Sequence, residues 1–294
     1  MELLQANPKA ATTPKIAVPR QPRRVGLITL SFCSFISLGV GLMLGFWGAL
    51  SFFVATPVAE TTETITKTAT ATSFNQALDL IRTARRNFAQ VRDYKCLYLR
   101  DEMVDGQMQM NTMALKVRHE PFSVAMEWLG PAQKKGRRVV FVQGKNDNKM
   151  LVKHLVTLKL DPQESIKRKE SRHTIQEAGI LNLINRYERS WEKEQSMGIT
   201  QLSVEEKTET IKLGEQAYTH VCSCVTSTHP IDSRNTFEYY IAKVYFDKTT
   251  GLPIRTEGFE FPSDGHPEGR LMERYTYLDL KLNPGLTEAD FTLK

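Results

Sequence analysis

One stretch of the sequence gathers the side chains best suited to chemistry, Tyr218-Thr-His220-Val-Cys222-Ser-Cys224. If it forms a strand, His220, Cys222 and Cys224 face the same way, because side chains in a strand repeat every two residues. An imidazole and two thiols on one face are suitable ligands for zinc or copper. Two other interpretations stay open, a disulfide from Cys222 or Cys224 to Cys96, or small buried thiols without a chemical role.

Motifs of catalysis and phosphate binding are absent from the rest of the sequence. It has no Gly-x-Ser-x-Gly elbow, no His-Glu-x-x-His pair and no phosphate loop. We therefore predict a protein without catalytic residues or a cofactor. An enzyme would depend on the His220–Cys224 strand alone.

A long uncharged run indicates where the protein resides. Residues 25–59 contain no charged side chain, and a bilayer core needs about 20 apolar residues of helix. The 24 residues before the run carry five basic side chains and one acid, and basic flanks stay in the cytoplasm. We predict a single-pass protein of the inner (cytoplasmic) membrane, with a cytoplasmic N-terminus and a periplasmic or otherwise extracytoplasmic C-terminal domain. Export to an oxidising compartment would permit the disulfide.

The charge balance argues against a nucleic-acid partner. The formal net charge is +6, and residues 1–24 contribute five positive charges minus one, or +4. Only +2 remains for the other 270 residues, and no basic stripe with interleaved aromatic residues stands out. Within the uncharged run, small residues recur every four positions and include Gly41 and Gly45, a spacing that would allow a homodimer through the transmembrane helix.

Periodicity divides the chain into four segments. They are a disordered basic tail (1–24), a transmembrane anchor (25–54), a Thr-rich linker (55–73) and a folded domain (74–294). Within the domain, helical spacing begins at Ser73 and recurs at 174–195. Strand patterns occupy 93–104, 107–119, 122–129, 137–143 and 149–158, and then 199–213, 216–228, 237–248, 252–261 and 270–281. This order predicts an α+β fold dominated by antiparallel sheet.

Five sequence segments carry a resemblance to a known superfamily. They are VRDYKCLYLRDE (91–102), KVRHEPFSVAMEWLGP (116–131), KGRRVVFVQGKNDNKMLVKH (135–154), VYFDKTTGLPIRTEGFEFP (244–262) and MERYTYLDLKLNPGLTEADF (272–291). Together they resemble an uncharacterised, bacterial domain-of-unknown-function branch of the outer-membrane lipoprotein carrier (LolA/LolB-like) superfamily. The resemblance implies an incomplete antiparallel β-barrel (half-barrel) with helices packed on its concave side. It also implies that an acyl chain or another apolar partner binds in that concavity.

The resemblance and the strand alternation together predict an apolar ligand site. Six of the ten methionines fall between 103 and 150, and flexible Met side chains suit surfaces that accept varied apolar shapes. The expected cavity residues are Phe122, Val124, Met126, Trp128, Phe141, Met150 and Val152, with a lid formed by the helix around 180–187. The same residues could instead form a closed core.

Two functions fit these observations. In the first, the membrane-anchored domain binds a lipid, an acyl chain or another apolar ligand. In the second, it is an envelope regulator or assembly protein whose sheet binds a protein partner and no small molecule.

Overall fold

A long helix leads into the sheet. The computed structural model describes residues 60–293, and helix α1 (Glu60–Phe88) opens this range. Sequence spacing placed the helix start at Ser73, so the part of the expected linker from residue 60 onward is helical instead. No Gly or Pro interrupts residues 60–88, which lets the helix extend toward its N-terminus. From Phe74 to Phe88 its buried side chains recur at helical spacing.

The first half of the sheet is a meander of consecutive antiparallel strands. Its strands are β1 (Asp93–Val104), β2 (Gln107–Arg118), β3 (Ser123–Gly130), β4 (Arg138–Val142), β5 (Met150–Lys153) and β6 (Thr157–Leu160). Short 3-10 turns η1 (Ala132–Lys134) and η2 (Asn146–Asn148) lie between β3 and β5. The segment 149–158, expected as one strand, is in fact two strands joined at residues 154–156.

A helical connection joins the two halves of the sheet. It contains α2 (Glu164–Lys167), the 3-10 turn η3 (Ile175–Glu177) and α3 (Ile180–Met197). Gly179, with φ of 111°, precedes α3, and Gly198 ends it in the left-handed conformation. Backbone at positive φ favours glycine, which explains both helix boundaries.

The second half is another meander. Its strands are β7 (Gln201–Leu213), β8 (Gln216–Thr228), β9 (Ile241–Asp247), β10 (Pro253–Phe259) and β11 (Leu271–Leu282), with η4 (Ile231–Ser233) after β8 and η5 (Glu288–Phe291) after β11. The alternation of apolar and polar residues therefore predicted these five strands correctly, within a few residues at their ends.

The two meanders meet at the centre of a single large, open, antiparallel sheet. Its strand order is β6-β5-β4-β3-β2-β1-β11-β10-β9-β8-β7. The first and last strands of the chain are therefore neighbours, and they pair from Tyr94–Leu282 to Glu102–Glu273. The predicted α+β class, a large antiparallel sheet with a few helices, is confirmed.

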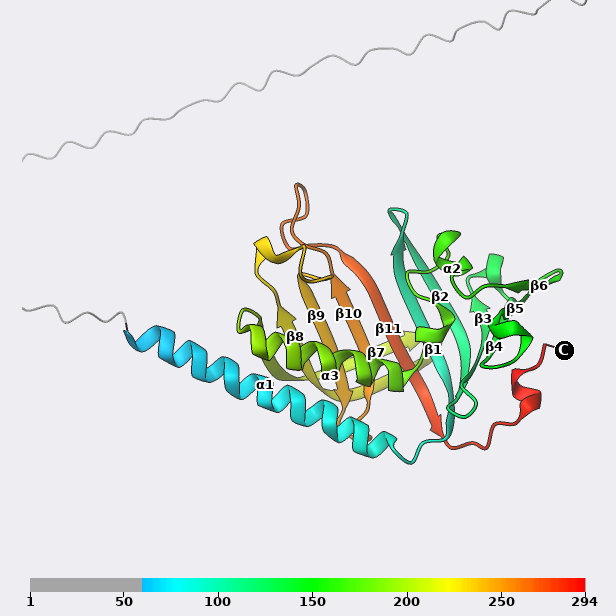
Figure 1. Cartoon of the computed structure of the whole chain (residues 1–294), viewed down its shortest axis with the longest axis horizontal. Coiled ribbons are helices and arrows are strands. Elements are labelled where there is room, and N and C mark those ends of the chain that lie inside the picture. Colours follow the sequence, from blue (N-terminus) through cyan, green and yellow to red (C-terminus); the bar gives the residue numbers. More distant parts are fainter. Residues whose placement is uncertain (1–59, 294) are drawn as a thin grey trace, which may run out of the picture. The chain divides into compact units, whose positions relative to one another are not determined.

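The main hydrophobic core lies between one face of this sheet and the helices, and we call this face the core face. Figure 1 shows α1 and α3 crossing the sheet, and side chains of both helices belong to the core cluster. Two smaller clusters lie on the opposite face. One contains Cys222, Cys224, Tyr245 and Ile254. The other packs Val140 and Val142 against Phe291 of η5.

The described residues, 60–293, belong to one compact unit with its own core. Within residues 60–293, no helix is both long enough and apolar enough to span a bilayer. The basic tail at 1–24, the expected anchor at 25–54 and its Gly41–Gly45 pair lie outside the described residues.

Candidate ligand site between the sheet and helix α3

A cavity of about 310 Å³ lies between the core face and the connection that leads from α2 into α3. Its sheet side is formed by β1, β3, β4, β5, β10 and β11, and its other side by residues between Ser165 and Arg189, here called the lid segment. Pockets that hold small molecules range from about 300 to 1,000 Å³, so this cavity is at the small end of that range.

One part of the cavity wall is apolar. Met126 of β3 and Val139 of β4 are direct cross-strand partners, and Met150 of β5 continues the surface. Leu183 and Tyr187 of α3 complete the lining from the lid segment. This part of the cavity can remove an aliphatic group from water without demanding a particular shape.

A tryptophan flanked by two guanidinium groups forms a second part of the lining. The indole Nε1 of Trp128 donates a hydrogen bond to Asn111 Oδ1 at 3.0 Å. The guanidinium carbons of Arg100 and Arg137 lie 5.7 and 5.2 Å from the Trp128 ring centroid. Arg137 also pairs with Glu170 of the lid segment. These cation–π contacts hold the ring in one orientation.

Two buried carboxylates face each other where β1 meets β11. Glu102 and Glu273 are direct cross-strand partners and both line the cavity. The Tyr275 hydroxyl lies 2.6 Å from Glu102 Oε1 and 3.1 Å from Glu273 Oε2. Opposed like charges destabilise a sheet unless other groups compensate them. Arg100 of β1 compensates Glu102, with its Nε 3.5 Å from Glu102 Oε2, and the other compensating groups come largely from the lid segment.

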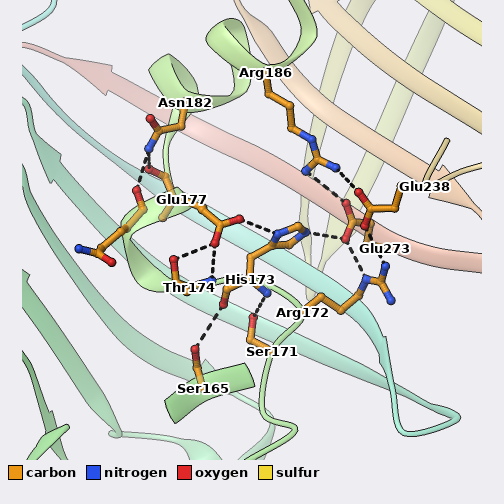
Figure 2. Close-up of polar contacts among 12 residues, drawn as sticks. Ser165, Ser171, Arg172, His173, Thr174, Glu177, Asn182, Arg186, Glu238 and Glu273 are labelled. Atoms are coloured by element: carbon orange, nitrogen blue, oxygen red, sulfur yellow. Dashed lines mark hydrogen bonds and ion pairs between the residues drawn. The ribbon is translucent and has the colours of Figure 1, made fainter. Parts of the chain in front are cut away.

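Residues before and within α3 supply these groups, and Figure 2 shows the ones around Glu273. Ser171 Oγ donates to Glu102 Oε1 at 3.0 Å, and His173 Nε2 lies 2.9 Å from Glu273 Oε2. Arg172 Nε donates to the same Glu273 oxygen at 3.1 Å. Arg186 Nη2 donates to Glu238 at 2.9 Å, and its Nη1 lies 3.9 Å from Glu273 Oε1.

The electrostatics of this network favour the charged forms. Burial raises the pKa of Glu273, but hydrogen bonding and charge from His173, together with the charge of Arg186, lower it to about 2. For His173, burial lowers the pKa, but the hydrogen bond and the charge of Glu273 outweigh the effect of burial and raise the pKa above its ordinary value. The second ring nitrogen, Nδ1, lies 2.9 Å from Glu177 Oε2. Both ring nitrogens of His173 are therefore engaged, and the imidazole bridges the lid segment and the sheet. A general base needs a ring nitrogen within reach of a substrate proton, and neither nitrogen of His173 is free for that role.

The predicted site residues divide into two groups. Met126, Trp128 and Met150 line the cavity. Val124, Phe141 and Val152 are buried in the core cluster, and Phe122 packs against its edge, 6.3 Å from the Phe141 ring centroid. The alternation identified the correct face of the sheet, but it could not show which part of that face the helices cover. The lid residues Leu183 and Tyr187 do lie over the cavity, as the helix around 180–187 was expected to do.

The polar network was missed, although the sequence carries a signal for it. Counting in twos from Tyr98 along β1 reaches Arg100 and Glu102, and counting back from Tyr277 along β11 reaches Tyr275 and Glu273. Core-facing positions thus change from aromatic to charged on both strands, a pattern that marks a buried polar site.

The expected disulfide is not formed. Among the described residues, Cys96, Cys222 and Cys224 are all free thiols. Cys96 belongs to the core cluster on the core face, whereas Cys222 and Cys224 belong to the cluster on the opposite face. Strands β11, β10 and β9 separate Cys96 on β1 from β8. Opposite faces and three intervening strands exceed the reach of an S–S bond.

The three metal candidates do share one side of β8, but they do not form a binding group. His220 Nδ1 lies 3.1 Å from Asp247 Oδ1, and Cys222 and Cys224 pack in the small apolar cluster. Within residues 60–293, no group of three His, Cys, Asp or Glu side chains is arranged to hold a metal ion.

Several solved structures are similar to this chain at low identity. The lipoprotein LppX of Mycobacterium tuberculosis is 15% identical, with 72% of this chain and 98% of that chain covered and a TM-score of 0.41. A DUF1329 family protein of Desulfovibrio piger is 11% identical, with 75% and 97% covered and a TM-score of 0.37. A LolA superfamily protein of Nitrosomonas europaea is 10% identical, with 74% and 97% covered and a TM-score of 0.31. At these values no ligand or activity is transferred to this chain.

No curated protein matches the sequence significantly. The family comparison is decisive, because one family model matches residues 91–294, from just before β1 to the end of the chain. The predicted membership of an uncharacterised family of domains is thereby confirmed: the chain belongs to the family described as "Protein of unknown function (DUF1571)".

Proposed function

We propose that the domain binds a lipid, an acyl chain or another apolar ligand in the cavity beneath the lid segment, and that it does so without catalysis. The observation that carries this proposal is the apolar wall formed by Met126, Val139 and Met150 opposite Leu183 and Tyr187. Binding would come from apolar area removed from water, at about 25 cal/mol per Å², so chain identity would matter little.

In this proposal the sheet forms a half-barrel, and the helices pack on its concave side. The lid segment is joined to the sheet by its ion pairs to Glu273 and by apolar contacts of α3. A ligand would enter by displacing part of the lid segment, while the sheet itself stays unchanged. The small volume favours a single acyl chain over a multi-chain lipid.

Titration with a fluorescent fatty acid tests the proposal on the fragment 60–294, which contains the complete core. We expect saturable binding that unlabelled lipid competes away. Met126→Trp fills the cavity and should weaken binding by about tenfold or more, since it displaces ligand volume. Met110→Trp is the matched control, because Met110 is 62% exposed on β2.

Far-ultraviolet circular dichroism must show that both variants are folded. No saturable uptake by the folded wild-type fragment would overturn the proposal. A protein partner bound through the sheet would then be the better account. Equal weakening by both tryptophan variants would also count against the cavity.

We further propose that residues 25–54 anchor the domain in the inner membrane, with the domain on the extracytoplasmic side. The support is the 35-residue uncharged run with its basic flank. A reporter enzyme that is active only after export, fused after Lys294, should be active, and activity of a cytoplasm-only reporter there would reverse the topology.

Dimerisation through Gly41 and Gly45 should weaken on Gly41→Ile in a membrane two-hybrid assay, and an unchanged signal would exclude it.

A further inference from the structure

The turn between β5 and β6 exposes two adjacent aliphatic side chains. Leu155 is 92% exposed and Val156 is 66% exposed. The turn consists of His154, Leu155 and Val156, and it contains none of the Gly, Pro, Asn, Asp and Ser residues that dominate turns for conformational reasons. The geometry of the turn therefore does not account for its apolar residues.

A third exposed aliphatic residue lies at the same end of the sheet. Arg138 at the start of β4 pairs with Lys153 at the end of β5, so the β3–β4 connection and the β5–β6 turn share this end. Leu129, at the end of β3, is exposed there. We call Leu129, Leu155 and Val156 the apolar tip.

The surroundings of the apolar tip are basic. Five basic residues lie at this end of the sheet, Lys134, Lys135, Arg137 and Arg138 at the β3–β4 connection and Lys153 at the end of β5. Arg137 pairs with Glu170 and Arg138 with Glu127, so these five basic and two acidic residues carry a net charge of +3. Lys135 is exposed at this end. The apolar tip therefore lies on a surface with an excess of positive charge.

We propose that the apolar tip docks on a bilayer that contains anionic lipids. Two or three aliphatic side chains are too few for a stable protein interface, which buries about 800 Å² on each partner. The same side chains suffice at a membrane, where a few inserted apolar groups act together with basic residues attracted to anionic headgroups. The basic surroundings complement an anionic surface and would oppose contact between two copies of this chain.

Docking at this end would bring the cavity to the membrane, an extension that rests on the proposed function. Trp128 and Arg137 line the cavity, and each is the sequence neighbour of a residue at this end, Leu129 and Arg138. A ligand could then pass between bilayer and cavity over a short path. Docking itself depends only on the apolar tip and its charges.

Vesicle binding by the fragment 60–294 tests the proposal, because this fragment lacks the uncharged run. Vesicles of phosphatidylcholine with and without phosphatidylglycerol would be sedimented with the wild type and two double variants. Leu155→Ser/Val156→Ser removes the aliphatic groups and leaves every charge in place. Ile199→Ser/Ile231→Ser is the matched control, because both isoleucines are exposed elsewhere on the domain.

The wild type should bind the anionic vesicles, less so as salt rises, and the tip variant should bind about tenfold more weakly while the control does not change. The proposal is wrong if the wild type does not bind, if both double variants bind alike, or if removing the apolar tip instead dissolves an oligomer. The fatty-acid titration separates the two proposals, since the tip variant should take up free fatty acid normally. Vesicle binding without fatty-acid uptake would support docking and refute the cavity.

Discussion

Glu102 of β1 and Glu273 of β11 are direct cross-strand partners, and each carboxylate accepts a contact from the lid segment. The Ser171 hydroxyl donates a hydrogen bond to Glu102, and the His173 imidazole contacts Glu273. Opening the lid segment would leave two buried like charges opposed with fewer compensating groups. The carboxylates thus favour a closed lid, and apolar contacts are not its only restraint.

Replacing His173 should make the free energy of unfolding less dependent on pH. The pKa of His173 is raised above its ordinary value of 6.5, so its contribution to stability is complete below 6.5 and is lost as pH rises through the folded value. The pKa of Glu273 is lowered to about 2, so its contribution holds above 4.5 and is lost as pH falls toward about 2. His173→Gln should reduce the free energy of unfolding by about 1–3 kcal/mol at mildly acidic pH and by less at alkaline pH.

Urea denaturation of the wild type and His173→Gln across this pH range measures the difference. His154→Gln is a suitable control, because His154 is exposed at the β5–β6 turn. A difference between wild type and His173→Gln that does not vary with pH would show that the imidazole contributes packing and no charge.

Removing the Tyr94 hydroxyl should destabilise the start of α3. The N–H of Ile180 donates to Tyr94 Oη at 2.9 Å, and both residues are fully buried. Tyr94→Phe leaves that amide without its partner, at a cost of about 1–3 kcal/mol in the free energy of unfolding. Tyr218→Phe, on the opposite face of β8, should cost less than half as much in the same denaturation experiment, and equal losses would contradict this role for Tyr94.

Two neighbouring core positions on β5 should differ in their effect on ligand selectivity. Met150 lines the cavity, whereas Val152 is buried in the core without reaching it. Both Met150→Ala and Val152→Ala should lower stability, by about 2–5 and 1–3 kcal/mol respectively. Only Met150→Ala enlarges the cavity, so only this variant should shift preference toward longer fatty acids in a competition series. A shift with Val152→Ala as well would mean that the cavity extends farther than its present lining.

The cysteines of the domain should behave as buried, reduced thiols. Burial raises the pKa of Cys96 and Cys224, and raises that of Cys222 to about 12, so the reactive thiolate is scarce at neutral pH. Alkylation of the fragment 60–294 under denaturing, non-reducing conditions should modify three thiols, and the native fragment should react slowly. Modification of only one thiol would show that the other two cysteines form a disulfide.

The strands could be predicted from sequence because apolar and polar residues alternate along each one, and this alternation separates its two faces. The turn at residues 154–156 could not, since His-Leu-Val carries no turn signal and the run reads as one continuous strand. The start of α1 was placed too late, because Ser73 has the chemistry of an N-cap, yet no residue before it breaks the helix.

The site was only partly accessible from sequence, for a different physical reason. Alternation could place Met126 and Met150 on the core face, but the cavity depends on where the lid segment leaves space above them. His173 and Glu273 are 100 positions apart in sequence, so neither local pattern could reveal their contact. Charged residues on a core-facing register, such as Glu102, are the local sign of such a long-range partnership.

The junction of β1 and β11 also has a consequence for how the chain folds. Each meander forms contacts between neighbours in sequence, whereas the junction joins Tyr94 to Leu282 and must close almost the whole domain into a loop. Loop closure costs entropy before its contacts repay it, so contacts of large sequence separation slow folding. We expect the two meanders to form first and to join last, so that Leu278→Ala at the junction should mainly accelerate unfolding in stopped-flow experiments, with little change in refolding rate. Kinetic stability, and with it the lifetime of the folded domain, would then depend on a single pair of strands.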